Sequence, residues 1–281
     1  MGKYLLSAFA DEYSSSFDMQ LAMLAEQGVS YIEPRLVDGN NISSLEAIEV
    51  AEIKKKLDAH GIGVSSIGSP LGKIKLTDDF DAHIEMTKRT CETACALETK
   101  NVRMFSFYLG EGVTREACRE EVLEKLNAML EVAEAYGLTF CHENEAKIYG
   151  ESPESCLDLL TAFGGRLSCV FDMGNFVLCG SRPYPDGYDL LKDYIRYFHI
   201  KDSLYRGAIV PPGCGEASIA EILKDFATVA DSNVFVTLEP HLETFDGLNR
   251  LKGQDFENPY RFENAQVAFL TALNKLKEII S

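Results

Sequence analysis

The feature that most constrains the fold is the regular alternation of short β-rich runs with longer segments of helical periodicity. Eight runs rich in β-branched and aromatic residues are candidate strands, at residues 4–9, 31–35, 63–67, 102–107, 138–143, 167–172, 197–201 and 234–239. Eight candidate helices follow them in turn, at residues 17–27, 45–60, 80–97, 115–136, 153–163, 188–194, 219–229 and 260–280. This order is typical of a parallel sheet with crossover helices.

The number and length of these units favour a closed barrel. Eight β/α units in 281 residues average about 35 residues each, which suits a (β/α)₈ TIM barrel better than a doubly wound sheet. Helix ends can also be recognised, because Gly28, Gly61 and Gly137 follow helical patterns and Ser152 precedes Pro153 as an N-cap. No linker-like segment interrupts the series, so we predict an α/β protein with one TIM-barrel domain over residues 1–281.

Charge and cysteine content exclude several classes of partner. The chain has 27 Lys and Arg against 44 Asp and Glu, a formal charge of −17, so we expect no binding to nucleic acid or to anionic membranes.

No run of 18 apolar residues is present, and the apolar run at 4–10 is broken by Asp11 and Glu12, so we predict a cytoplasmic protein. The eight cysteines form no CxxC pair and are expected to be reduced core residues.

Ionisable residues stand at the ends of four successive candidate strands: Glu143, Asp172, His199 and Glu239. In a TIM barrel these ends converge on the catalytic face. One polar residue after a strand is ordinary, because loops begin there, but four on adjacent strands indicate a site. Two Glu, one Asp and one His could enclose one divalent cation, with Mn²⁺, Mg²⁺, Co²⁺ or Zn²⁺ as suitable ions.

These strand ends carry a family resemblance. The segments HENE (142–145), FDMGN (171–175), FHIKD (198–202) and LEP (238–240), with the loop PGCGE (212–216), resemble those of the xylose isomerase-like TIM barrels. That group contains sugar isomerases, ketose 3-epimerases and endonuclease IV. The resemblance implies that Glu143, Asp172, His199 and Glu239 bind one metal ion, Mn²⁺ in the first place, and that Glu143 and Glu239 also act as acid and base.

The implied activity is isomerisation or epimerisation of a small sugar or related polyhydroxy ketone. A bound metal would stabilise an enediolate while a carboxylate on either side of the carbon removes and returns a proton. The second metal of the longer xylose isomerases lacks recognisable ligands here, so proton transfer is favoured over hydride transfer. A dehydratase of a cyclic polyol ketone and a non-catalytic sugar-binding barrel are the alternatives, whereas the charge opposes a DNA-repair role. The chain could also form a homo-oligomer.

Further side chains are candidates for contact with substrate: Glu33, Asn175, Lys201 and Arg206. Glu33 could instead form a structural pair with Arg35 or a helix, and Lys201 a salt bridge with a ligand carboxylate. Asn175 replaces the His that the epimerases carry, and Arg206 lies one residue beyond the expected position of an Arg.

Other ionisable residues are weaker candidates. His142 and Glu145 flank Glu143 and could support it, although loop roles are as consistent with the pattern. His60 and His83 fall in helical segments and are predicted to be surface or capping residues, whereas His241 could approach the site from beyond Glu239.

Overall fold

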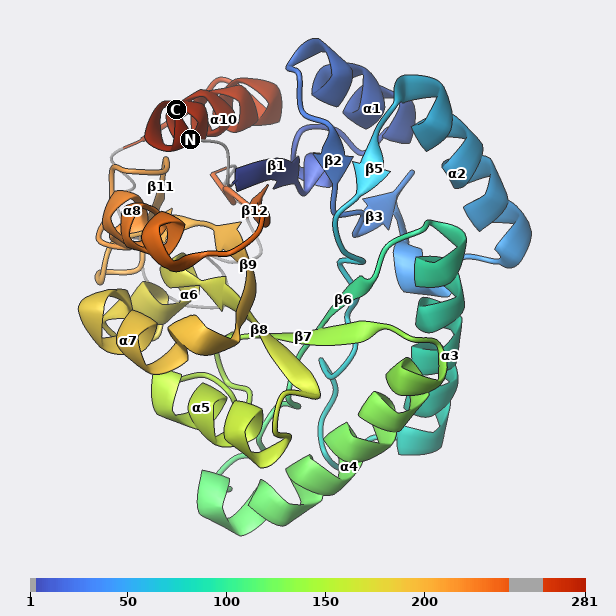
Figure 1. Cartoon of the computed structure of the whole chain (residues 1–281), viewed down its shortest axis with the longest axis vertical. Coiled ribbons are helices and arrows are strands. Elements are labelled where there is room, and N and C mark those ends of the chain that lie inside the picture. Colours follow the sequence, from blue (N-terminus) through green and yellow to red (C-terminus); the bar gives the residue numbers. More distant parts are fainter. Residues whose placement is uncertain (1–3, 243–259) are drawn as a thin grey trace.

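The computed structural model describes residues 4–242 and 260–281, in which parallel strands form a ring surrounded by helices (Figure 1). Six strands share one hydrogen-bonded sheet in the order β1 (Tyr4–Ala8), β12 (Val234–Leu238), β9 (Ile195–Ile200), β8 (Leu167–Asp172), β7 (Thr139–Glu143) and β6 (Asn101–Met104). The first and last strands of the chain therefore pair directly, with Tyr4 opposite Val234 and Ala8 opposite Leu238.

Two short strands complete the ring on the opposite side. β2 (Tyr31–Ile32) pairs in parallel with β5 (Gly63–Val64). The Glu33 amide donates to Ala8 O at 3.1 Å, and Arg103 donates to Ile67 O at 3.0 Å, so backbone hydrogen bonds link this pair to β1 and β6. The predicted (β/α)₈ barrel is confirmed within the described residues, with several strands shorter than the apolar runs that identified them.

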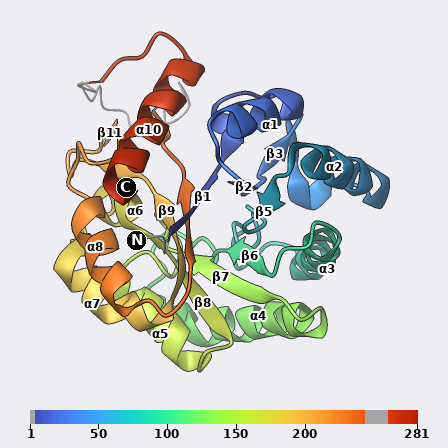
Figure 2. The same ribbon diagram turned by 45° about the horizontal axis from the view of Figure 1, so that its top comes forward.

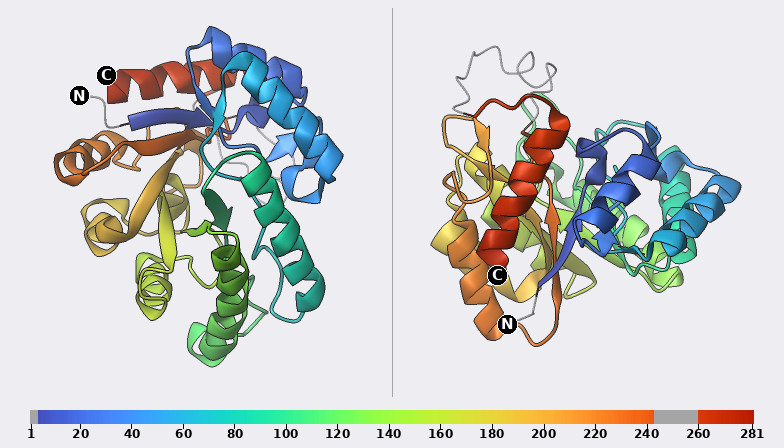
Figure 3. Two further views of the ribbon diagram at one scale, coloured as in Figure 1. Left: turned by 45° about the vertical axis from the view of Figure 1, so that its right-hand side comes forward. Right: turned by 90° about the horizontal axis from the view of Figure 1, so that it is seen from above.

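The long helices lie outside the ring (Figures 1 and 2). They are α1 (Phe17–Glu26), α2 (Ala47–His60), α3 (Phe80–Ala96), α4 (Arg115–Ala135), α5 (Pro153–Ala162), α8 (Ile219–Val229) and α10 (Ala265–Ile280). The predicted stops are confirmed, since Gly28, Gly61 and Gly137 have φ of 68°, 65° and 65°. Ser152 caps α5 by accepting a hydrogen bond from the Ser155 amide. Figure 3 shows α10 beside β1, where the two ends of the described chain meet.

Four local features differ from the sequence prediction. The short helix α6 (Met173–Leu178) was not expected, because six residues show no usable periodicity. The helix expected at 188–194 is α7 (Tyr188–Leu191) followed by a 3₁₀ turn. The last helix starts at Ala265 instead of 260, because the Asn264 side chain accepts from the Val267 amide and caps it. Two hairpins were also missed, β3 (Leu36–Val37) with β4 (Asn40–Asn41) and β10 (Asp202–Ser203) with β11 (Ile209–Val210).

Aromatic side chains fill the layer between the sheet and the helices. Phe171 of β8 contacts Phe198 of the neighbouring strand and Phe176 of α6 edge to face, and Phe198 packs in the same way against Phe226 of α8. The structure shows no disulfide among the eight cysteines, all of which lie in its described residues, and five of them are buried. No helix among the described residues is long and apolar enough to cross a membrane.

Candidate metal centre and active site

Four strand ends bring their ionisable side chains to one point inside the barrel mouth. Glu143, Asp172 and His199 are the last or penultimate residues of β7, β8 and β9, and Glu239 follows β12 directly. Asp172 lies opposite His199 in the β8–β9 register, and Thr237 lies opposite His199 in the β12–β9 register. One ligand atom from each of the four lies within 4.8 Å of the others, and each residue is at most 3% exposed.

The His199 ring shows how a cation would fit. Its Nδ1 lies 3.0 Å from Glu143 Oε1 and 3.4 Å from Glu239 Oε2, yet it is buried without a hydrogen-bond partner. Its Nε2 lies 3.2 Å from Glu33 Oε2 on the other side. Histidine ligands of metals are usually oriented by such a carboxylate, which leaves the second nitrogen free to coordinate. The unpartnered Nδ1, surrounded by carboxylate oxygens, therefore suits a divalent metal ion.

Two buried cations balance part of the negative charge. Arg103 Nη1 lies 3.2 Å from Glu143 Oε2, and Lys201 Nζ lies 3.0 Å from Asp172 Oδ2 and 3.2 Å from Glu239 Oε2. With Glu33 included, four buried carboxylates face these two cations. Arg35 also contacts Glu239, but it pairs with Asp11 and Glu12 as well and is counted with them. Two negative charges therefore remain at the centre when His199 is neutral. Buried charge of this size is costly unless it is compensated. One divalent ion would neutralise it.

These contacts shift the ionisation of the ligands in different directions. Burial opposes ionisation of Glu143, but His199 and Arg103 outweigh it and lower the pKa of this carboxyl to about 2. The pKa of Glu239 is also held well below its usual value, because Lys201 and the neighbouring histidines overcome burial. For Asp172 burial dominates and raises the pKa to about 6. Glu143 and Glu239 are therefore ionised at neutral pH and able to accept a proton.

Of the predicted substrate contacts, three are packed around this centre. Lys201 makes the salt bridges described above, which was one of its two interpretations. Asn175, at the start of α6, donates to Glu143 Oε1 at 3.4 Å and accepts from Lys201 at 3.1 Å. Both oxygens of Glu33 have partners, Tyr197 Oη at 2.9 Å and His199 Nε2. Substrate contact stays a prediction for each.

Arg206 is the exception. It lies exposed in the turn between β10 and β11, and no hydrogen bond or ion pair joins it to the four ligands within the part of the chain that the structure describes. The Gly-x-Gly segment lies in the next loop, between β11 and α8, and its Gly213 and Gly215 amides donate to Asp202 Oδ2 at 2.8 and 2.9 Å. A Cβ on Gly215 would lie 2.2 Å from Asp202 Oδ1, so this segment wraps a carboxylate of its own chain.

Two arginines of the site were missed as functional candidates. Arg103 lies on β6 between Val102 and Met104, which are both fully buried. A cationic residue inside an apolar strand predicts that a buried carboxylate pairs with it. Arg35 was considered only as a partner of Glu33. Its Nη1 instead lies 3.0 Å from Glu239 Oε1, a contact between strand ends 204 residues apart that no local pattern reveals.

The other histidine and glutamate candidates differ in whether they contact the metal centre. His241 approaches the centre, with Nε2 3.4 Å from Glu239 Oε1. His142 points away from the ligands, and its Nε2 contacts Ser106 Oγ at 2.9 Å. Glu145 pairs with Lys73 at 3.1 Å. The expectation of a surface position for His83 is wrong, because its ring is buried against the loop before α3 and accepts the Gly72 amide at 2.8 Å.

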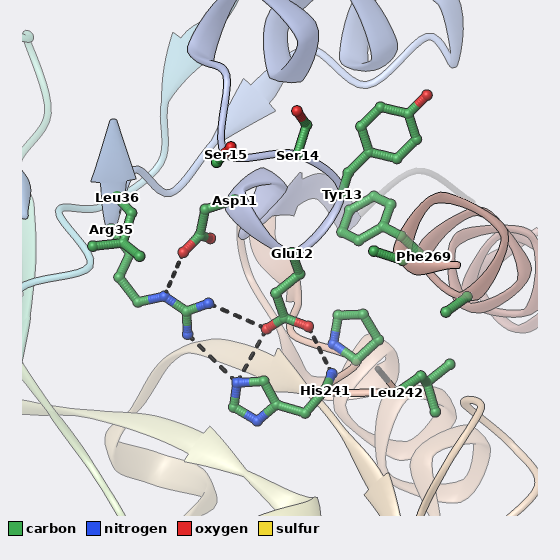
Figure 4. A pocket seen from close by; sticks show the side chains of 13 residues that line it. Asp11, Glu12, Tyr13, Ser14, Ser15, Arg35, Leu36, His241, Leu242 and Phe269 are labelled. Carbon is green, nitrogen blue, oxygen red and sulfur yellow. Dashed lines mark hydrogen bonds and ion pairs between the residues drawn. The ribbon is translucent and has the colours of Figure 1, made fainter. Parts of the chain in front are cut away.

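A cavity of about 540 Å³ opens next to Glu239, between the first turn after β1 and helix α10 (Figure 4). Its polar side is formed by Asp11, Glu12, Arg35 and His241, and its apolar side includes Phe269 of α10. Pockets of this size accommodate small-molecule ligands. None of the four candidate ligands lines this cavity, and it adjoins the metal centre through Arg35 and His241, which both contact Glu239.

Comparison with known proteins concerns the fold. A search of the curated proteins found no match. Among solved structures, the probable 3-DHS dehydratase AsbF from Bacillus anthracis is 18% identical, with a TM-score of 0.73 over 100% of this chain and 99% of that one. The IOLI protein with a bound zinc atom is 17% identical, with a TM-score of 0.76 over 99% of this chain and 98% of that one. A D-tagatose 3-epimerase-like protein is 17% identical, with a TM-score of 0.74 over 99% of this chain and 97% of that one.

The TM-scores show a shared fold. The family model described as "Xylose isomerase-like TIM barrel" matches residues 21–256, which include all four strand ends of the candidate metal centre. The chain belongs to the xylose isomerase-like TIM barrel family.

Proposed function

We propose that this protein is a divalent-metal-dependent isomerase or epimerase of a small sugar or related polyhydroxy ketone. The observation that carries the proposal is the buried quartet Glu143, Asp172, His199 and Glu239, with the unpartnered Nδ1 of His199 at its centre. Solved relatives of the same fold include a zinc-containing protein and a D-tagatose 3-epimerase-like protein. We also propose that residues 1–281 form one domain and that Mn²⁺ is the preferred ion.

The quartet would hold the ion, with His199 oriented by Glu33. When bound, a divalent ion polarises a substrate carbonyl and favours loss of the proton on the adjacent carbon. Two carboxylates of the chain are then placed for acid–base work. Glu143 and Glu239 approach His199 Nδ1 from different strands, and both are ionised at neutral pH.

In this proposal one of the two glutamates removes the proton and becomes protonated. In isomerisation the same carboxyl returns that proton to the neighbouring carbon. In epimerisation the opposite glutamate must first take up a proton from solvent, which it then delivers to the other face while the first glutamate keeps the proton it removed. Arg103 and Lys201 keep these carboxylates in place by ion pairs at 3.2 Å each. Burial of the whole cluster excludes bulk water, which strengthens these electrostatic contacts. The arrangement therefore suits proton transfer next to a carbonyl.

The test is proton exchange with solvent. The metal-loaded protein is incubated in D₂O with ketoses of three to six carbons, and NMR follows deuterium incorporation next to the carbonyl. Glu143→Gln and Glu239→Gln should each lower the exchange rate at least a hundredfold, because general acid–base catalysis contributes about 10²–10⁴-fold. Glu134→Gln, a surface carboxylate paired with Arg166, is the control and should exchange like wild type.

Absence of exchange on every ketose would contradict the isomerase proposal. The dehydratase alternative is read in the same samples, because loss of a β-hydroxyl after proton removal yields a conjugated enone with a new ultraviolet absorbance. Binding of metal and ketose without exchange or absorbance would indicate a non-catalytic sugar-binding barrel.

A further inference from the structure

A second group of possible ligand atoms adjoins the metal centre on the far side of Glu239. Glu12, from the turn after β1, and His241 offer one atom each together with Glu239, and these atoms lie within 4.8 Å of one another. His241 Nε2 is 3.1 Å from Glu12 Oε1 and 3.4 Å from Glu239 Oε1. We call Glu12, Glu239 and His241 the outer cluster.

The two oxygens of Glu239 are divided between the two groups. Oε2 faces Lys201 at 3.2 Å and His199 at 3.4 Å, on the side of the metal centre. Oε1 faces Arg35 at 3.0 Å and His241 at 3.4 Å, on the side of the outer cluster. A carboxylate divided in this way has the arrangement that bridges two cations about 3.5–4 Å apart in two-metal sites.

In the outer cluster the cation is a side chain. The Arg35 guanidinium lies 3.3 Å from Glu12 Oε1 through Nη2, 3.0 Å from Glu239 Oε1 through Nη1 and 3.5 Å from His241 Nε2, and its Nε lies 2.8 Å from Asp11 Oδ2. Figure 4 shows the Arg35 side chain pointing toward Asp11, Glu12 and His241. The guanidinium also lies over the Phe9 ring, with Cζ 4.6 Å from the ring centroid.

The surroundings of Arg35 contain unused acceptor capacity. Asp11 Oδ1 is buried without a hydrogen-bond partner, on a side chain that is 3% exposed. Asp11 and Glu12 together carry two negative charges, of which Arg35 neutralises one. Without Arg35, the Glu12 carboxylate, the shared Glu239 and the His241 imidazole would face one another with Asp11 beside them, and such donors suit a divalent ion.

We propose that Arg35 is the resident cation of a second cation position formed by the outer cluster, and that it keeps the centre mononuclear. Asp11 lies beside this position, with Oδ2 2.8 Å from Arg35 Nε. The inference rests on the proposed function only in that the inner quartet binds the first ion. Replacing Arg35 by a neutral side chain opens the outer cluster to a second divalent ion of the same kind.

The test measures metal stoichiometry, not activity. Wild type and Arg35→Met are dialysed to equilibrium with excess Mn²⁺, and bound metal is determined by elemental analysis. We expect one ion per chain in wild type and two in Arg35→Met. The double variant Arg35→Met/Glu12→Gln should return to one. Arg166→Met, which removes an arginine paired with Glu134 at the surface, is the matched control and should bind one.

When wild type binds one ion, a folded Arg35→Met that also binds only one overturns the inference, and so does a wild type that binds two. If Arg35→Met does not fold, Arg35→Gln takes its place. Electron paramagnetic resonance of Mn²⁺-saturated wild type needs no variant at all, and an exchange-coupled manganese pair in it would overturn the proposal. A wild type that binds no ion contradicts the proposed function instead. In that case an Arg35→Met variant that binds one ion would still support the outer cluster as a cation position, and an Arg35→Met variant that binds no ion would refute the outer cluster.

Discussion

The carboxylate of Glu33 gives the sharpest test of the metal centre, because it touches the centre only through His199. Glu33 is fully buried, and its Oε2 lies 3.2 Å from His199 Nε2 while Oε1 accepts from Tyr197 Oη at 2.9 Å. Glu33→Gln preserves the shape of the side chain and an acceptor for Tyr197. What it removes is the negative charge that orients the ring and strengthens Nδ1 as a ligand.

The expected magnitude follows from that role. Loss of such an orienting partner typically weakens metal binding by about 10–100-fold, which corresponds to a loss of about 1.4–2.7 kcal/mol in binding free energy. The stabilisation of the folded chain by saturating Mn²⁺ should fall by the same amount, since it equals RT ln(1 + [L]/Kd). Stability in EDTA should change less than stability in Mn²⁺.

Isothermal titration calorimetry measures the affinity, and urea unfolding in EDTA and in Mn²⁺ measures the linked stability. Glu145→Gln is the control, because Glu145 lies at the same end of the barrel but pairs with Lys73 and not with His199. Wild-type Mn²⁺ affinity in Glu33→Gln would refute the reasoning. An equal loss of stability with and without metal would assign Glu33 a purely structural role.

Three further predictions concern single residues. Burial disfavours the charged His199 ring, but Glu143 and Glu33 raise its pKa well above the usual value, so a bound metal ion must displace a proton from the ring. Mn²⁺ affinity should therefore rise with pH. Calorimetry in buffers of different ionisation enthalpy should show about one proton released per bound ion. Burial lowers the pKa of His142 to about 4. As pH falls from 6.5 towards 4, the unfolded chain therefore binds a proton at this residue that the folded chain does not bind. The free energy of unfolding, measured in urea, should drop by up to about 3 kcal/mol over this range, and the drop should be smaller in His142→Gln. Gly174→Ala would place a Cβ 2.6 Å from the Lys201 carbonyl oxygen; it should lower stability by about 1–3 kcal/mol and weaken Mn²⁺ binding, and an unchanged melting temperature would contradict this.

The order of secondary structure is a local property of this chain, and for that reason it could be predicted. Each strand run is bounded by its own turn residues, and each long helix carries its own periodicity and caps, as at Gly61 and Ser152. Elements without such signals could not be predicted from the sequence. α6 is one example, because it is held by the Asp172 cap and by the close approach of Gly174 to Lys201.

The four candidate ligands were accessible to sequence reasoning for a related reason. Parallel strands in a barrel end on one face, so an ionisable residue at each strand end predicts convergence without any knowledge of distance. The contacts that give the site its charge balance involve other strands. Arg103 reaches Glu143 from the adjacent strand β6, and Glu33 reaches His199 from across the barrel.

The sequence alone determined the barrel, its order of elements and the four side chains at the candidate metal centre, because strand alternation and strand ends repeat a local rule. Only the tertiary structure decided what each of those side chains touches. Which nitrogen of His199 is held by Glu33, and which oxygen of Glu239 faces Arg35, depend on packing between residues more than 160 positions apart. Closure of the ring, with β1 beside β12, is the physical reason that Glu12, which follows β1, and Glu239, which follows β12, lie side by side.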